Sequence, residues 1–171
     1  MSGSHNKLRG NMTMKLYMHP VSTATRPVRL LIAENGIKCD EEMVDILQGA
    51  HYQQPYASLN PNRMVPMLED GDLRLTESSS ILKYLADKYD LPSYPKDLKK
   101  RANLCSNELT IADYFGAAVV SIRNLVGCDF SAYPNIKRWL DNLKRLKSWD
   151  HVNEVFNGFV AANKGKDLVR V

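Results

Sequence analysis

The 171-residue sequence predicts an α/β domain followed by an all-α domain. Two observations lead to this fold class. In the first half, short β-prone runs alternate with helical patterns, in the order βαβ and then ββα. In the second half, the apolar residues recur three or four positions apart, which is typical of helices. A stretch over residues 91–98 with two prolines lies between the halves and is expected to be the linker.

The first half opens with a strand, a helix and a second strand. Residues 15–18 are a short β-prone run, and residues 42–46 supply the second strand. Between them, a helical pattern has Pro27 in its first turn and Gly36 just beyond its last. A helix that connects two neighbouring strands predicts that those strands are parallel.

A hairpin and a helix complete this half. Residues 65–76 read as two brief strands around the turn at Asp70 and Gly71, which is a common hairpin signal. A helix then begins at Glu77 or Ser78 and runs to Tyr89. The order βαβ-ββα is that of a thioredoxin-like domain, which we place at residues 14–90.

Helices account for the second half, which we place at residues 99–171. Thr110 and Asp113 form a variant capping box that opens a helix to about Leu125. Pro134 starts a second helix that ends near Leu146, and a third runs from residue 149 to 159. Residues 1–13 are polar and are expected to form a flexible leader.

Composition excludes several classes of function. With 44% hydrophobic and 25% charged residues and no run of about 18 apolar residues, the chain predicts a cytoplasmic protein that contacts no membrane. The basic run at 137–147 has apolar residues at helical spacing between its lysines and arginines. The lysines and arginines are therefore expected on the solvent-exposed face of an amphipathic helix, and nucleic acid is not an expected partner. Cys39, Cys105 and Cys128 are far apart, so neither a disulfide framework nor a metal site is expected.

Four segments of the chain follow a recognisable order: residues 16–26, 60–68, 75–85 and 109–114. They resemble the characteristic segments of cytosolic glutathione S-transferases, and most closely those of the serine-type theta and delta classes. The resemblance implies a glutathione site on the thioredoxin-like half, with glutathione as co-substrate. It also implies a site against the helices for an electrophilic small molecule, and no metal or redox cofactor.

Ser22 stands where a serine-type transferase places the catalytic hydroxyl that hydrogen-bonds the glutathione sulfur. A thiolate accepts hydrogen bonds and is stabilised near a helix N-terminus, so this position suits the role. The alternative is that Ser22 only caps the following helix. Residues 22–25 contain no cysteine, which argues against the disulfide chemistry of a glutaredoxin.

Two pairs of residues resemble the family's binding positions for the peptide ligand. Val65 and Pro66 match a pair in which the proline is cis and the preceding backbone faces the cysteinyl part of glutathione. Glu77 and Ser78 match a pair that receives the γ-glutamyl end, where a hydroxyl and free amides suit a carboxylate and Glu77 suits the ammonium group. Alone, these residues would read as a strand-start proline and as helix caps.

Three further residues are assigned to the same site. His51 lies where delta-like members carry a histidine that reaches the glycyl carboxylate, although a loop histidine is commonly just solvated. Arg63 replaces a second histidine of that class and would keep a cation for the same carboxylate. Met64, next to Val65 in the matched segment, is included as a glutathione contact.

The helical half departs from the family pattern. Segments resembling residues 95–102 and 104–110 are adjacent here, whereas the family carries two long helices between them. Those helices normally supply much of the acceptor pocket and of the homodimer interface, so a homodimer is not assured for this chain. The alternative to a transferase is therefore a non-catalytic glutathione-binding or scaffold protein of the same fold. A third reading is a defective shortened product.

Overall fold

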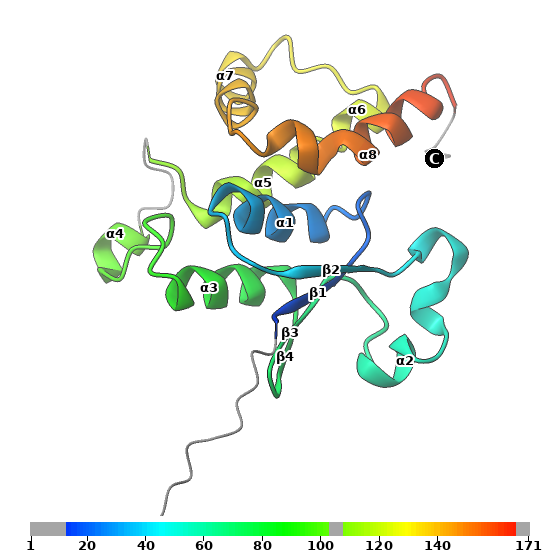
Figure 1. The fold of residues 1–171 in the computed structure, drawn as a ribbon. Coiled ribbons are helices and arrows are strands. Elements are labelled where there is room, and N and C mark those ends of the chain that lie inside the picture. Colours follow the sequence, from blue (N-terminus) through cyan, green and yellow to red (C-terminus); the bar gives the residue numbers. More distant parts are fainter. Residues whose placement is uncertain (1–12, 103–107, 167–171) are drawn as a thin grey trace, which may run out of the picture.

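The computed structural model describes residues 13–102 and 108–166 and contains a four-stranded mixed sheet with helices on both faces. The strand order is β2-β1-β3-β4 (Figure 1). The predicted leader at 1–13 falls almost wholly on residues 1–12, which lie outside the described part of the chain.

The opening βαβ unit forms as predicted, with a shift in its second strand. β1 is Lys15–Met18, α1 is Thr25–Glu34, and β2 is Asp40–Met43 rather than residues 42–46. β2 pairs parallel to β1, with Lys15 opposite Asp40 and Met18 opposite Met43. The register with β1 therefore sets the position of β2, and its four exposed residues give no alternating pattern that the sequence could reveal.

The hairpin and the helix after it are confirmed. β3 (Met67–Asp70) and β4 (Leu73–Thr76) are antiparallel, and Gly71 between them has a φ of 66°. That left-handed conformation is open to glycine without steric cost. α3 (Ser78–Lys88) follows directly and packs with α1 on one face of the sheet. The first half is thus the thioredoxin-like domain that the sequence predicts.

The segment between β2 and β3 covers the opposite face of the sheet. It contains two short 3-10 helices, η1 (Ile46–Gln48) and η2 (Ala50–Tyr52), and the short helix α2 (Tyr56–Leu59). A small separate core forms there, with partly buried apolar residues around it. Its buried members are Tyr17, Val44, Tyr56 and Met67.

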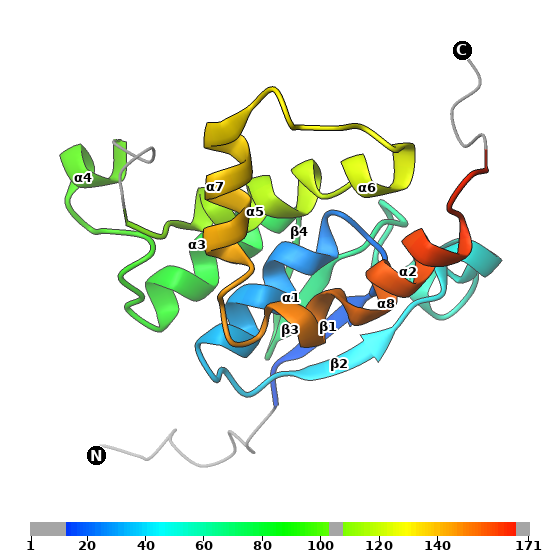
Figure 2. The ribbon, with the colours of Figure 1, turned by 90° about the horizontal axis from the view of Figure 1, so that it is seen from above.

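The second half is helical. Its first helix, α4 (Leu98–Ala102), has only five residues, and the described chain resumes at residue 108. α5 is Ile111–Val120, α7 is Pro134–Leu143 and α8 is Trp149–Ala162. These helices lie over α1, on the side of α1 away from the sheet (Figures 1 and 2). α4 starts at the last residue of the predicted linker.

One helix prediction was wrong: the helix from Thr110 does not run unbroken to Leu125. α5 ends at Val120, and a separate short helix, α6, covers Arg123–Val126. Ser121 explains the break, because its hydroxyl donates a hydrogen bond to Ala118 O at 2.8 Å. A serine that bonds back into the preceding turn competes with the helical backbone pattern. The predicted capping box of Thr110 and Asp113 is confirmed at the start of α5.

The two halves share one continuous hydrophobic core that includes residues of β1, α1, α3, α5, α7 and α8. Polar contacts add to it at the edges of α1. The Arg29 guanidinium donates two hydrogen bonds of 2.8 Å to the Glu41 carboxylate and one of 3.3 Å to Val152 O. The Glu34 carboxylate accepts a hydrogen bond from Ser148 N at 3.0 Å. α1 is therefore the element through which the halves are joined.

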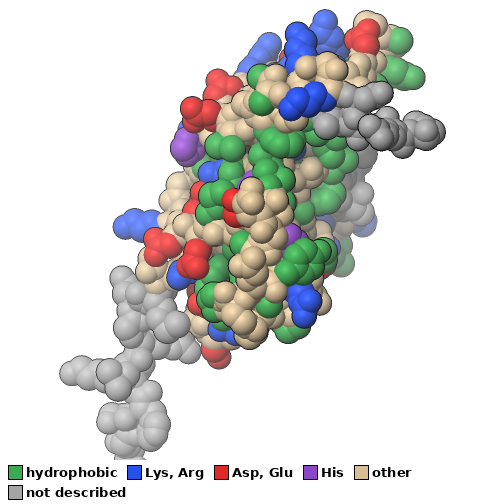
Figure 3. Space-filling model, turned by 90° about the vertical axis from the view of Figure 1, so that its right-hand side faces the viewer, with side chains coloured by type: hydrophobic (Ala, Val, Ile, Leu, Met, Phe, Trp, Pro, Cys, Tyr) green, Lys and Arg blue, Asp and Glu red, His purple; other side chains and the backbone are tan. Residues whose placement is uncertain are grey.

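The burial pattern of α7 and of Lys144 just after it agrees with the predicted solvent-exposed basic face. Leu140 and Leu143 are buried, whereas Lys137, Arg138 and Lys144 are exposed. On the face in Figure 3, Lys and Arg side chains gather mainly at the top, and hydrophobic side chains dominate the middle. Within residues 13–102 and 108–166, no helix is long and apolar enough to cross a membrane, and no cluster of His, Cys, Asp and Glu could hold a metal ion.

Candidate functional site

The sheet register brings three of the four matched segments, those at 16–26, 60–68 and 75–85, to one end of the sheet. β1 and β3 are antiparallel with Tyr17 opposite Met67, so the chain that leaves β1 and the chain that enters β3 lie at the same end. Thr76, the last residue of β4, is also opposite Met67. Because β2 is parallel to β1, the chain after Met43 emerges at this end too. Ser22, the segment 44–51, Val65 and Glu77 therefore converge there.

Ser22 lies in the turn between β1 and α1. Its hydroxyl oxygen accepts a hydrogen bond from Thr25 N at 3.2 Å, and its carbonyl accepts one from Arg26 N at 3.0 Å. These bonds place Ser22 at the head of α1, where its hydroxyl caps the first amide of the helix, although the N-cap residue itself is Ala24. A hydroxyl has one hydrogen to donate and two lone pairs to accept with, so the cap leaves the hydrogen free. The capping role and a thiol-binding role are compatible at this position.

The Val65–Pro66 peptide bond is cis, as the resemblance implies. The loop before it is anchored at one carbonyl: Met64 O accepts a hydrogen bond from Tyr56 Oη at 2.5 Å and another from Asn60 Nδ2 at 2.8 Å. Asn60 is almost fully buried, and the Met64 side chain is exposed. No motif in the sequence points to Tyr56 or Asn60, yet these two side chains hold the backbone that precedes Val65.

Glu77 and Ser78 occupy the start of α3. Glu77 is the N-cap residue with a φ of 68°, which is uncommon for any residue other than glycine. Its carbonyl accepts hydrogen bonds from Ser80 N and Ile81 N, both at 3.0 Å. Ser78 is buried, while the Glu77 side chain is exposed. The first amides of a helix have no acceptor within the helix, so this end of α3 offers donors to an anion.

His51 and Arg63 lie on either side of α2. His51 is part of η2 and is half-buried, and its ring centroid lies 4.0 Å from that of Tyr52. Its Nδ1 is buried and has no hydrogen-bond partner among the described residues. Arg63 is exposed and has a φ of 53°. The structure thus exposes the Arg63 side chain and part of the His51 side chain, whereas the His51 Nδ1 is buried.

Two buried residues that sequence reasoning missed flank Ser22. His19 directly follows β1, and Arg26 lies in the first turn of α1. The Arg26 guanidinium donates to Ser121 Oγ at 2.8 Å, to Asn153 Oδ1 at 2.9 Å and to Ala118 O at 2.9 Å. It also lies over the Phe156 ring, 3.7 Å from the centroid. Burial lowers the pKa of Arg26 to about 10, so the side chain is still charged at neutral pH.

No sequence pattern marks Arg26 as buried, because its hydrogen-bond partners lie at the end of α5 and in α8, between 92 and 127 residues away. Ala118 O lies in the last turn of α5, where the negative end of the helix dipole favours a cation.

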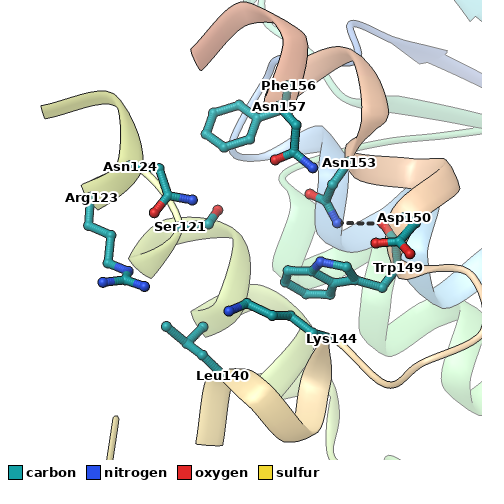
Figure 4. A pocket seen from close by; sticks show the side chains of 10 residues that line it. All are labelled: Ser121, Arg123, Asn124, Leu140, Lys144, Trp149, Asp150, Asn153, Phe156 and Asn157. Atoms are coloured by element: carbon teal, nitrogen blue, oxygen red, sulfur yellow. Dashed lines mark hydrogen bonds between the residues drawn. The ribbon is translucent and has the colours of Figure 1, made fainter. Parts of the chain in front are cut away.

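A cavity of about 210 Å³ lies in the helical half, next to the Arg26 contacts (Figure 4). Its buried polar groups already have partners. Ser121 Oγ and Asn153 Oδ1 accept from Arg26, and Asn153 Nδ2 donates to Trp149 O at 2.9 Å. None of the residues assigned to the candidate site lines this cavity, so we do not assign the glutathione site to it. Its lining residues are Ser121, Arg123, Asn124, Leu140, Lys144, Trp149, Asp150, Asn153, Phe156 and Asn157.

Comparison with known proteins agrees with this architecture. The sequence-family model of the glutathione S-transferase N-terminal domain matches residues 12–87, and the family model of the C-terminal domain matches residues 88–147. Human glutathione S-transferase theta-1 is 40% identical over 95 residues, which are 54% of this chain and 40% of the relative. Mouse glutathione S-transferase theta-2 is 36% identical over 118 residues, which are 68% of this chain and 46% of the relative.

A solved structure gives the same result. The crystal structure of a glutathione transferase homologue from Drosophila mojavensis with bound glutathione has a TM-score of 0.81 and 25% identity, over 90% of this chain and 97% of that chain. The fold and the two consecutive family matches show that the chain belongs to the glutathione S-transferase family. Within that family it is theta/delta-like. The matched part spans less than half the length of the theta-class relatives above.

Proposed function

We propose that this protein binds glutathione at the end of the sheet where Ser22, His51, Val65 and Ser78 converge, and transfers it to an electrophilic small molecule. The observation that carries the proposal is the position of Ser22. Its hydroxyl stands at the head of α1 with its hydrogen free to donate, at the same end of the sheet as the cis Val65–Pro66 bond and the start of α3.

The order of the strands suits an extended peptide. β1 precedes Ser22, β4 precedes Ser78, and β3, which follows Val65, lies between these two strands. A peptide laid across this end of the sheet would pass all three positions. In this arrangement the γ-glutamyl end binds at Glu77 and Ser78, and the cysteinyl backbone pairs with Val65. The glycyl carboxylate lies toward His51 and Arg63, and Met64 contacts the ligand beside Val65.

Ser22 would act on the thiol by favouring its charged form. Lowering the pKa of a thiol from about 8.5 by roughly two units needs about 2.7 kcal/mol of preferential thiolate stabilisation. One hydroxyl hydrogen bond to a charged acceptor, together with the positive end of α1, is of this size. Thr25 N donates to the Ser22 oxygen, and a hydroxyl that accepts one hydrogen bond becomes a stronger donor in the next.

The proposal also covers the acceptor substrate, the biological role and the assembly of the protein. The acceptor is an electrophilic small molecule bound against the helical half, and the reaction serves detoxification in the cytoplasm. α4 has five residues here, so the acceptor site and any homodimer would rely on α5 to α8 more than on α4.

Two measurements on the purified protein test the proposal. Calorimetry with glutathione gives the affinity, and turnover of glutathione with an electrophilic aromatic substrate such as chlorodinitrobenzene gives the activity. We expect saturable binding and turnover above the uncatalysed rate. Binding without turnover would instead select the non-catalytic glutathione-binding protein, and the absence of binding would contradict both.

A further inference from the structure

His19 contacts the chain that leads to Ser22 at two points. Its side chain is almost fully buried directly after β1. The imidazole Nδ1 accepts a hydrogen bond from Val21 N at 3.3 Å, and the His19 carbonyl accepts one from Ser22 N at 3.0 Å. The amides of the two residues that set the direction of the Ser22 side chain are therefore both bound to His19.

The other edge of the ring faces a second segment of the site. His19 Nε2 lies 3.7 Å from Asp45 Oδ1. That oxygen accepts hydrogen bonds from Leu47 N at 3.0 Å and from Gln48 N at 3.2 Å, which cap η1 on the way to His51. Since Nδ1 is an acceptor, the neutral ring carries its hydrogen on Nε2, toward Asp45.

We propose that His19 is a positioning residue for the thiol chemistry: its neutral imidazole fixes the Val21–Ser22 backbone, and thereby aims the Ser22 hydroxyl at the sulfur of bound glutathione. This inference rests on the proposed function. A histidine that merely filled the core would not need a particular ring nitrogen, whereas this role needs an unprotonated Nδ1. Desolvation lowers the pKa of His19, against the opposing effect of Asp45, and so keeps that nitrogen free at neutral pH.

Two substitutions of His19 distinguish the role of Nδ1 from that of Nε2. His19→Asn places an amide oxygen near the position of Nδ1 and keeps the acceptor for Val21 N. His19→Gln places its amide near Nε2 and removes that acceptor. The measured quantities are the pKa of the thiol of bound glutathione, kcat and KM with a fixed electrophile, and the hydrogen-exchange rate of the Val21 and Ser22 amides by nuclear magnetic resonance.

We expect His19→Gln to raise the thiol pKa, to lower kcat roughly five- to tenfold with KM nearly unchanged, and to speed exchange at Val21 by a similar factor. His19→Asn should leave the thiol pKa close to that of the parent, and should keep kcat, KM and the exchange rates within about twofold of the parent values. If Gln and Asn behave alike, or if Val21 exchange is unchanged in the Gln variant, the inference is wrong.

A measurement on the parent protein guards against a variant that does not fold. The nitrogen chemical shifts of the His19 ring at neutral pH should show hydrogen on Nε2 and none on Nδ1, and the opposite tautomer would overturn the inference. The parent also separates the two proposals. A lowered thiol pKa with no effect of His19→Gln leaves the proposed function standing and removes the role of His19. An ordinary thiol pKa in the parent removes both.

Discussion

The guanidinium of Arg26 in α1 donates a hydrogen bond of 2.9 Å to the side-chain oxygen of Asn153 in α8, and both side chains are buried. Arg26 also donates its backbone N–H to Ser22 O. The same residue thus contacts Ser22 in the turn before α1 and Asn153 in α8, the last of the described helices. Arg26 therefore links the helical half directly to the turn that holds Ser22.

Asn153→Ala should destabilise the protein by about 1–3 kcal/mol, because it leaves a buried cation without one of its acceptors. Asn163→Ala is the matched control. Asn163 Nδ2 donates to Phe159 O four residues before it, as Asn153 Nδ2 does to Trp149 O, but Asn163 is only half-buried, and it is Asn153 that accepts from Arg26. Urea denaturation gives both values. Equal losses in the two variants would mean that the bond to Arg26 contributes nothing.

Ser22→Ala should raise the pKa of the bound thiol while leaving glutathione affinity within a few-fold, since the hydroxyl favours thiolate over thiol. It should also cost about 0.5–2 kcal/mol of stability, because the cap of α1 at Thr25 N is lost. Ser22→Thr keeps a hydroxyl and serves as the control. An unchanged thiol titration in the alanine variant would leave Ser22 as a helix cap alone.

The double substitution Glu77→Gln and Ser78→Ala should weaken glutathione binding by about 2–4 kcal/mol, because charge-assisted hydrogen bonds to the γ-glutamyl end are lost. Ser80→Ala is the control, since Ser80 is exposed in the same turn of α3. Calorimetry measures each affinity. Parent-like binding by the double variant would place the ligand elsewhere.

Stability should fall as the pH drops below about 6.5, the ordinary pKa of histidine. Burial lowers the pKa of His19 in the folded state, with Asp45 acting in the opposite direction. The unfolded chain therefore binds the proton first, and the folded state loses stability until the pH has fallen past the lowered pKa. Thermal melts at a series of pH values measure this, with His19→Asn as the variant that lacks the group. If both proteins lose stability equally over that range, His19 is not the cause.

The helical half should self-associate through α5 or be only marginally stable. α5 is apolar on most sides, yet Phe115 and Val119, four residues apart, are 39% and 43% exposed. Each Å² of apolar surface left in water costs about 25 cal/mol. Sedimentation velocity should show association that the double change to serine at both positions reduces, whereas Val155→Ser on α8 does not. A monodisperse monomer that melts cooperatively above about 60 °C would contradict this, since ordinary domains melt near 45 to 65 °C.

Local patterns predicted most of the fold. The ends of α1 followed from Pro27 and Gly36, the hairpin from Asp70 and Gly71, and the start of α5 from Thr110 and Asp113. The features that were missed depend on distant partners. The position of β2 is set by its register with β1, and α5 ends where Ser121 bonds back to Ala118 O and both meet Arg26.

The candidate site could likewise be predicted only in part from the sequence. Resemblance supplied Ser22, Val65, Glu77 and Ser78, and the sheet register shows why they lie together. Their binding roles stay predictions. His19 could not have been singled out from the sequence, because its importance lies in which amide its ring nitrogen accepts from.

The most direct test of a glutathione site at this end of the sheet is the ultraviolet titration of thiolate in the complex of the parent protein with glutathione. We expect a midpoint near pH 6.5, about two units below that of a free thiol near 8.5. A midpoint at the free-thiol value, with glutathione shown by calorimetry to be bound, would contradict it.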